Sequence, residues 1–246
     1  MAPGWWHRGR VETMGEQRIA PRPVEDWDDE VRDAFNVLNP GDAKAEQEGS
    51  SPRSVPNMDE KVRAALIALN PGDAKSEQEG SSPQPTPNIL AVYAWHPELI
   101  RGWMPFSNHL RNSTLPSRTR ELVILRTAWL RQGEYQWAQH TRLGRLAGLS
   151  DSEIAAVRKG AEDSSWDAFD AAVLRAADEI CLDRNVSDAT WRELEARLDR
   201  KQLMDLVFTA GTYDMHCMAF HTFGLQLDPG MQGFDPDEAH TSHSPA

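Results

Sequence analysis

Apolar residues recur every three or four positions from Asn88 to Gly224, with polar residues between them. This spacing places apolar side chains on one face of a helix, and few runs alternate residue by residue as strands do. Loops of only a few residues separate the periodic stretches. The pattern therefore predicts an all-α fold. We expect helices at 88–95, 97–112, 117–131, 134–148, 151–160, 167–184, 188–199 and 201–224.

Capping residues mark several ends of these helices. We expect Ser117 and Ser187 to be N-caps, because a serine side chain accepts a hydrogen bond from a free N–H group of the first turn. Ser150 and Glu153 have the spacing of a capping box. Glycine tolerates the left-handed conformation that ends many helices. The expected stops are Gly148, Gly160 and Gly224.

A tandem duplication precedes this helical region. Residues 28–57 and 59–88 are related by an offset of 31, and EVRDAFNVLNPGDAKAEQEGSSP in the first copy matches KVRAALIALNPGDAKSEQEGSSP in the second. Each copy predicts one short amphipathic helix, which Asn-Pro-Gly ends, and then a polar stretch too poor in apolar residues to pack. Two units are fewer than a solenoid needs. The duplication is either a redundant surface insertion or a partner-binding arm.

These patterns predict one domain with appendages, which a chain of 246 residues is long enough to form around a sizeable core. The helix of the first repeat, near 26–38, belongs to an arm that carries the duplication. The expected organisation is a disordered or mobile N-terminal tail at 1–25, the arm at 26–87, the helical domain at 88–228 and a mobile C-terminal tail at 229–246.

Charge and cysteine content narrow the choice of partner and compartment. The net charge of −12 and the pI of about 5.1 argue against nucleic acid or an anionic membrane surface as the main partner. Cys181 and Cys217 are far apart and lack CxxC spacing, so neither a disulfide framework nor a zinc ribbon is expected. The sequence shows neither a signal-peptide core nor a run of about 18 apolar residues. We therefore expect a cytoplasmic protein whose partners are small molecules or other protein chains.

Glu121 and His140 form the main candidate for a chemical site. Glu121 stands on an otherwise apolar stripe of the helix at 117–131, and His140 lies in the next helix. If the two helices are antiparallel, Glu121 lies about ten residues before the turn and His140 about eight after it, which gives a height difference of roughly 3 Å. The two side chains can therefore meet. Such a pair suits proton transfer near neutral pH, or it only fixes the hairpin.

The same stretch resembles a known family. Glu121, Gly133, Gln136 and His140 match the spacing of the alkylhydroperoxidase AhpD motif, Glu-x11-Cys-x2-Cys-x3-His, with both cysteines missing. The run RELVILRTAWLRQGEYQWAQHTRLGRLAGLSDSEI, with HPELIRGWMPFSNHLRNSTLPSRT before it and LMDLVFTAGTYDMHCMAFHTFGLQLD after it, resembles the carboxymuconolactone decarboxylase family. The resemblance implies an AhpD-like helical bundle and a homo-oligomer, a trimer or hexamer, with pockets at or near subunit contacts.

The missing cysteines favour one of the family's two chemistries. A dithiol peroxidase needs a thiolate to attack the peroxide and a second thiol to resolve the sulfenic acid, and neither Gly133 nor Gln136 can supply one. The decarboxylase branch needs no cofactor. We therefore expect a cofactor-free lyase that acts on a small oxygenated ring compound, lactone or oxo acid. The alternatives are a dehydratase or isomerase of a hydrophobic alcohol or ketone, and a non-catalytic oligomeric scaffold that binds a small ligand.

The resemblance places Glu121 and His140 in the pocket. His140 is the expected proton donor or acceptor, and Glu121 its orienting partner or the base. Tyr135 is a weaker catalytic candidate, because it is either a hydrogen-bond donor to an oxyanion or a core aromatic residue. Trp137 either lines the pocket or only packs. Three arginines are candidates for binding a substrate carboxylate, and Arg126 is preferred since it is embedded in LVILRTAW. The other two are Arg118 and Arg120.

The last helix departs from the family pattern. Asp214 stands where family members more often have histidine, so the substrate of this chain is in doubt. His221 is seven residues further on and shares a face with Asp214, while Tyr213 and His216 lie on a second stripe. All four are candidates for substrate contacts. We expect no metal site, because His216 and His221 are five residues apart, which does not suit two ligands on one helix face.

Overall fold

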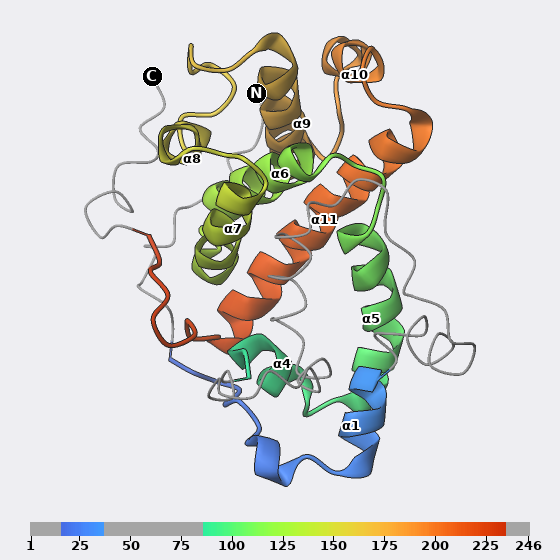
Figure 1. The fold of residues 1–246 in the computed structure, drawn as a ribbon, viewed down its shortest axis with the longest axis vertical. Coiled ribbons are helices and arrows are strands. Elements are labelled where there is room, and N and C mark those ends of the chain that lie inside the picture. Colours follow the sequence, from blue (N-terminus) through green and yellow to red (C-terminus); the bar gives the residue numbers. More distant parts are fainter. Residues whose placement is uncertain (1–15, 37–85, 235–246) are drawn as a thin grey trace, which may run out of the picture.

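The computed structural model describes residues 16–36 and 86–234, and all regular structure in these two stretches is helical (Figure 1). A 3-10 helix, η1 (Val24–Asp26), precedes the α-helices. These are α1 (Asp29–Asn36), α4 (Asn88–Tyr93), α5 (Pro97–Arg111), α6 (Ser117–Leu130), α7 (Glu134–Leu146), α8 (Asp151–Val157), α9 (Ala168–Asp183), α10 (Asp188–Glu195) and α11 (Arg200–Phe223). The all-α prediction is confirmed. In these stretches no helix is both long and apolar enough to cross a bilayer.

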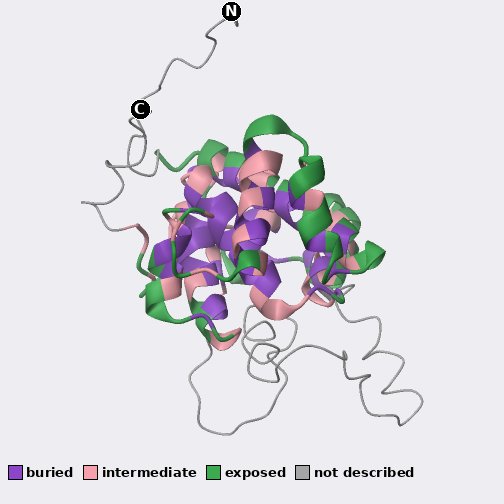
Figure 2. Ribbon diagram, turned by 90° about the horizontal axis from the view of Figure 1, so that it is seen from above, coloured by how far each residue is buried: buried purple, intermediate pink, exposed green. Residues whose placement is uncertain are grey.

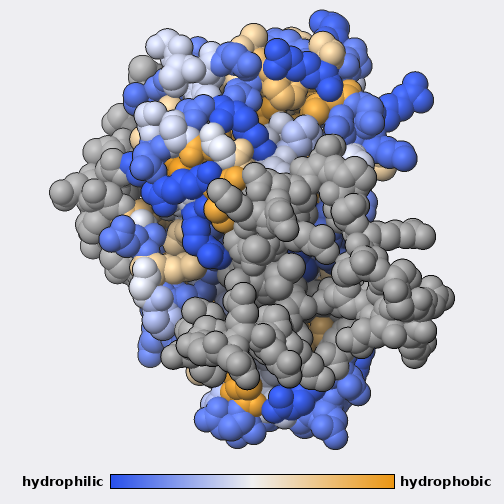
Figure 3. Space-filling model, in the orientation of Figure 1, coloured by the Kyte–Doolittle hydropathy of each residue, from blue (hydrophilic) through white to orange (hydrophobic). Residues whose placement is uncertain are grey.

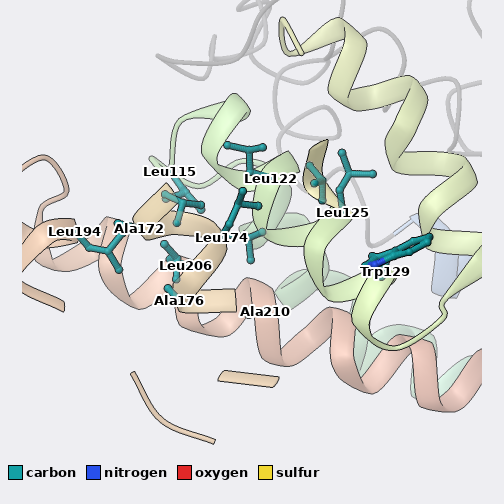
Figure 4. Close-up of a cluster of buried hydrophobic side chains, with 14 of the residues drawn as sticks. Leu115, Leu122, Leu125, Trp129, Ala172, Leu174, Ala176, Leu194, Leu206 and Ala210 are labelled. Carbon is teal, nitrogen blue, oxygen red and sulfur yellow. The ribbon is translucent and has the colours of Figure 1, made fainter. Parts of the chain in front are cut away.

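Helix α6 lies in the core and is buried on all sides. Every residue from Thr119 to Trp129 is buried, because α7, α9 and α11 all pack against this helix. Its apolar side chains meet those of α9 and α11 in the main cluster (Figure 4), and buried residues fill the middle of the bundle (Figure 2). A helix buried all round also carries polar side chains into the interior. This is how charged residues of α6 become available to an internal site.

The helix ends mostly follow the capping signals. Ser150 forms the predicted capping box with Glu153, and Ser187 accepts a hydrogen bond from the backbone of Thr190 as an N-cap. The expectation for Ser117 was wrong, because Pro116 is the N-cap and Ser117 is the first helical residue. Gly148, Gly160 and Gly224 all have the positive φ expected of helix stops.

The N-terminal segment packs against the far end of the bundle. Trp27, Val31 and Phe35 form a second apolar cluster with α4 and α5. Residues 16–25 belong to the stretch predicted as an N-terminal tail, and here Arg18 and Arg22 donate backbone hydrogen bonds to the carbonyls of Phe223 and Ala91. The helix of the first repeat is thus α1. The second repeat and the rest of the first lie outside the described residues.

The C-terminal segment also remains on the bundle beyond Asp228. The Asp228 carboxylate accepts hydrogen bonds from Tyr135 and Gln139, and the Phe234 ring packs against Trp129 and Trp137. In the stretch predicted to begin a mobile tail, Phe234 therefore contacts the core. The remainder of that tail is outside the described stretches.

Candidate functional site

Glu121 and His140 meet across the α6–α7 hairpin. Helix α6 ends at Leu130 and α7 begins at Glu134, so the two helices fold back on each other around a short turn. His140 Nδ1 lies 2.7 Å from Glu121 Oε2, with Glu121 2% exposed and His140 8% exposed. The predicted contact is present. A buried carboxylate bonded to an imidazole fixes which ring nitrogen faces it, and leaves the other, Nε2, for a different partner.

Arg120 supplies positive charge beside this pair. Its Nε lies 3.4 Å from Glu121 Oε1, and its Nη1 donates to the Arg111 carbonyl over 3.3 Å. Arg120 is buried, so its charge is little screened by solvent. The site therefore combines an anion, a cation and an imidazole in a low-dielectric environment.

The three residues line a small cavity of about 30 Å3 between α5, α6, α7 and α11. This volume is room for one or two water molecules. The lining residues are Ser107, Leu110, Arg111, Arg120, Glu121, Ile124, His140, Thr209, Thr212, Tyr213 and His216.

Three polar atoms of this lining lack a hydrogen-bond partner within the described parts of the chain. They are Arg120 Nη2, Thr209 Oγ1 and His216 Nε2, and all three are buried. Leaving a buried donor or acceptor unsatisfied costs roughly 1–3 kcal/mol, so native proteins rarely leave three beside one cavity. A small polar group in the cavity would satisfy them. These three atoms are therefore available to water or to a small polar ligand in the cavity.

Aromatic rings form the wall on the α11 side. The Tyr213 ring contacts the His140 ring edge-on, with 4.8 Å between centroids. The His216 ring stacks on Phe220 at 5.2 Å and meets Trp103 edge-on at 4.9 Å. Burial raises the pKa of the Tyr213 hydroxyl, and the Glu121 charge adds to this effect, so the phenol stays neutral.

His216 is neutral at physiological pH. Burial, and secondarily the positive charge of His140, lowers the pKa of the His216 imidazole from 6.5 to about 4. Its neutral ring can either accept or donate a hydrogen bond at Nε2. The cavity therefore holds two imidazoles in different surroundings: His140, bonded to a carboxylate, and His216, packed among aromatic rings.

The lowered pKa of His216 predicts a pH-dependent loss of stability. Between pH 6.5 and about 4 the unfolded chain binds a proton at His216 that the folded chain does not. The free energy of unfolding should therefore fall as the pH drops through this window, by about 3 kcal/mol at its acid end from this residue alone. Urea unfolding of the wild type and of His216→Phe at several pH values measures the effect. The pH profiles should diverge below pH 6.5, and parallel profiles would contradict this assignment.

Two predicted residues of α7 lie away from the cavity. The Tyr135 hydroxyl donates to Asp228 Oδ2 over 2.8 Å, and this residue borders a separate small pocket near the C-terminal segment. Trp137 packs in the main core cluster against Trp129 and Phe234. Residue 135 lies on a different face of α7 from His140, whereas Trp137 also faces α6 but lies nearer the turn, where it contacts Trp129 instead of the cavity.

Arg126, Asp214 and His221 are also held elsewhere. Arg126 forms an ion pair with Asp178 and donates to the carbonyls of Val157 and Arg158. Asp214 pairs with Arg131 and Arg184. His221 Nε2 lies 2.7 Å from the Gln132 carbonyl oxygen. None of the three lines the cavity, so the contacts predicted for them with a substrate there are not supported.

Of the three arginines predicted to bind a substrate carboxylate, only Arg120 lines the cavity. Thr209, which was not predicted, also lines it. Arg118 pairs with Glu153 and Asp170, which leaves Arg120 as the one that faces the cavity. A sequence signal for Arg120 did exist, since it directly precedes Glu121. Thr209 gave no such signal, because a threonine in an apolar helix is ordinarily a packed residue.

The space beside Gly133 is filled by Cys217. A Cβ atom at residue 133 would lie 2.3 Å from Cys217 Sγ and 3.0 Å from Gln136 Oε1. Both cysteines are free and buried. Burial raises the pKa of the Cys217 thiol to about 12, which keeps it protonated and a poor nucleophile. A thiol thus lies near the motif positions 133 and 136, but in an unreactive state.

Comparison with known proteins identifies the family of the central part of the chain. Residues 97–179 match the Carboxymuconolactone decarboxylase family. These residues run from the start of α5 into α9 and include Arg120, Glu121 and His140. No curated protein matches the chain.

Three solved structures have a similar fold. A protein of unknown function from Agrobacterium tumefaciens, whose description relates it to the antioxidant defence protein AhpD, is 19% identical, with a TM-score of 0.52 over 55% of this chain and 94% of its own. An uncharacterized peroxidase-related protein from a Silicibacter species is 17% identical, with a TM-score of 0.54 over 71% of this chain and 87% of its own. Another uncharacterized peroxidase-related protein, from Ralstonia eutropha and described as an alkylhydroperoxidase AhpD core, is 16% identical. Its TM-score is 0.54 over 73% of this chain and 95% of its own. At these identities the similarity establishes the fold alone.

Proposed function

From the match of residues 97–179 to the Carboxymuconolactone decarboxylase family and from the AhpD-like fold, we propose that the chain is a cofactor-free lyase that acts on a small oxygenated ring compound, lactone or oxo acid. The observation that carries this proposal is the buried Glu121–His140 pair beside a cavity with three unsatisfied polar atoms. An acid–base pair next to unoccupied hydrogen-bonding groups supports proton transfer on a bound molecule.

The proposed reaction breaks the bond between a substrate carbon and its carboxylate. Carbon dioxide leaves, and the electron pair of that bond passes into a conjugated carbonyl group, which becomes a dienolate. His140 then donates a proton to the carbon that lost the carboxylate, and Glu121 stabilises the charged imidazole and holds the ring in place. Solvent returns the proton to His140 after release of the product.

Arg120 and Thr209 are the proposed donors to the enolate oxygen. The guanidinium remains protonated at any physiological pH, and its Nη2 is one of the unsatisfied atoms of the cavity. The Thr209 hydroxyl can donate to the same oxygen. Preorganised donors of this kind stabilise charge as it develops, and they are most effective in a site from which water is excluded.

The size of the cavity bears on the substrate. A volume of about 30 Å3 is smaller than any ring compound, so side chains of the lining have to move when a substrate enters. His216 on α11, a partly exposed residue, is the proposed gate, because its Nε2 makes no hydrogen bond that would hold the ring in place.

The second candidate is dehydration or isomerisation of a hydrophobic alcohol or ketone. The observation that favours it is the neutral His216 among Trp103, Tyr213 and Phe220, which offers a second proton acceptor in an apolar wall. Such reactions remove a proton from one atom and deliver another proton elsewhere, which suits two imidazoles on one cavity.

A substrate panel tests the proposal. Purified protein is assayed with lactone acids, 3-oxo acids, hydrophobic alcohols and ketones, and an organic hydroperoxide, while carbon dioxide release and product formation are followed. We expect turnover with carbon dioxide release from a lactone or oxo acid. Dehydration or isomerisation without carbon dioxide would establish the second candidate. Reduction of the hydroperoxide, or saturable binding without turnover of any compound, would refute both.

A further inference from the structure

The outer face of α11 is unusually apolar for a surface helix. Between Gln202 and Phe220, the exposed residues of this helix are all apolar or glycine. They are Met204, Val207, Phe208, Gly211, Met215 and Met218. The surface of the described residues visible in Figure 3 is hydrophilic over most of its area. A contiguous apolar face on a soluble protein marks an interaction site.

The spacing of these residues indicates that the partner is a helix. Residues 204, 208, 211, 215 and 218 follow one another at intervals of four, three, four and three. This is the spacing of the two apolar positions of a heptad, which places the side chains along the seam of a coiled coil. The opposite face of α11 carries Thr209 and Thr212 to the cavity, so the seam faces away from the site and the core.

The seam is complementary to itself. Consider an antiparallel pair of α11 helices whose two-fold axis passes midway between residues 208 and 211. Phe208 of one copy then lies beside Gly211 of the other. Met204 lies beside Met215, because Met204 is four residues before Phe208 and Met215 is four residues after Gly211. A Cβ atom at Gly211 would meet no atom within 4 Å, so the surface above it is open. Phe208 is 52% exposed although its ring meets Phe106 of the same chain edge-on at 5.9 Å, and it is the knob that we expect to pack into this hole. Contacts that repeat reciprocally across two copies are those of a two-fold axis.

We propose that the Met204–Met218 face of α11 binds a second copy of this chain in an antiparallel, two-fold arrangement, with Phe208 packed over Gly211 of the partner. Of the trimer and the hexamer that the family resemblance implies, only the hexamer contains two-fold axes. The contact therefore predicts a dimer or a hexamer. It does not depend on the proposed function, since the seam contains no residue of the cavity lining.

The mass of the full chain in solution tests the contact. Wild type, Phe208→Glu and Leu99→Glu are compared by sedimentation at micromolar concentrations. Leu99 on α5 is the matched control, because it is a similarly exposed apolar residue, 47%, off the seam. We expect an even-numbered assembly for the wild type and for Leu99→Glu. Phe208→Glu should weaken the two-fold contact by at least about 30-fold, as expected of an aromatic residue at the centre of an interface, with an unchanged circular dichroism spectrum. A monomeric wild type, or an assembly that Phe208→Glu leaves intact, would overturn the proposal.

Cysteine cross-linking tests the direction and register of the pair. Met204→Cys and Met215→Cys chains are mixed and oxidised, and we expect a disulfide-linked heterodimer from the mixture and little homodimer from either variant alone. A homodimer from each single variant would indicate parallel helices. Equal lack of cross-linking in every combination would place the contact on another face. Either result would overturn the arrangement proposed here.

Discussion

Replacement of His140 by alanine should lower turnover of the active substrate by about 100-fold or more, in line with the loss of a general acid–base group. Glu121→Gln should have an effect of the same order, because an amide can still bond to the imidazole but cannot stabilise its charged form. Both side chains are buried and bonded to each other, so each variant has to be checked for folding by its thermal melting curve.

The chain offers a matched control for this experiment. His109 and Asp205 form a second histidine–carboxylate pair, with 2.9 Å between Nε2 and Oδ1, but the His109 side chain is 60% exposed and does not line the cavity. His109→Ala should therefore leave turnover unchanged. Full activity in both His140→Ala and Glu121→Gln would remove the basis of the proposed mechanism, whatever the substrate.

Replacement of Arg120 by methionine should lower kcat/KM by about 100- to 1,000-fold, the effect of removing one donor to a developing oxyanion. Methionine retains much of the volume of the arginine stem but has no charge and no donor. Arg118→Met is the control, since Arg118 is paired with Glu153 and Asp170 away from the cavity.

The kinetic signature distinguishes two roles for Arg120. A loss carried mainly by kcat indicates that the guanidinium stabilises the enolate in the transition state, as proposed. A loss carried mainly by KM indicates that it holds the substrate carboxylate equally in the ground and transition states. Thr209→Val should show the same signature as Arg120→Met with a smaller loss. Wild-type kinetics in Arg120→Met would contradict any role for this residue in the site.

The sequence predicted the helices and the central pair because both depend on local periodicity. Glu121 and His140 lie at similar distances from a short turn, and two antiparallel helices joined by such a turn bring those positions together. The first residues of α8 and α10 were predicted from their N-caps, Ser150 and Ser187, which are also local signals. Ser117 was misplaced because Pro116, whose own conformation is not helical, is a competing N-cap.

The rest of the site depends on contacts between residues far apart in the chain. Arg126 and Arg120 both belong to a helix that is buried all round, and only the position of Asp178 on α9 decides that Arg126 is neutralised away from the cavity. The helix pattern predicts Asp214 as a pocket residue, but ion pairs with Arg131 and Arg184 hold its carboxylate elsewhere. A hydrogen bond to Asp228, 93 residues away, likewise occupies Tyr135. No local pattern contains this information.

The most direct test of the proposed acid–base chemistry is the reaction of the identified substrate in D2O, with the product analysed by NMR and mass spectrometry. The account predicts that the wild type places one deuterium, on a single face, at the carbon that lost the carboxylate, and that His140→Ala loses this stereospecific transfer together with the rate. A product of the wild type with no deuterium at that carbon, or an equally fast and equally stereospecific labelling by His140→Ala, would contradict it.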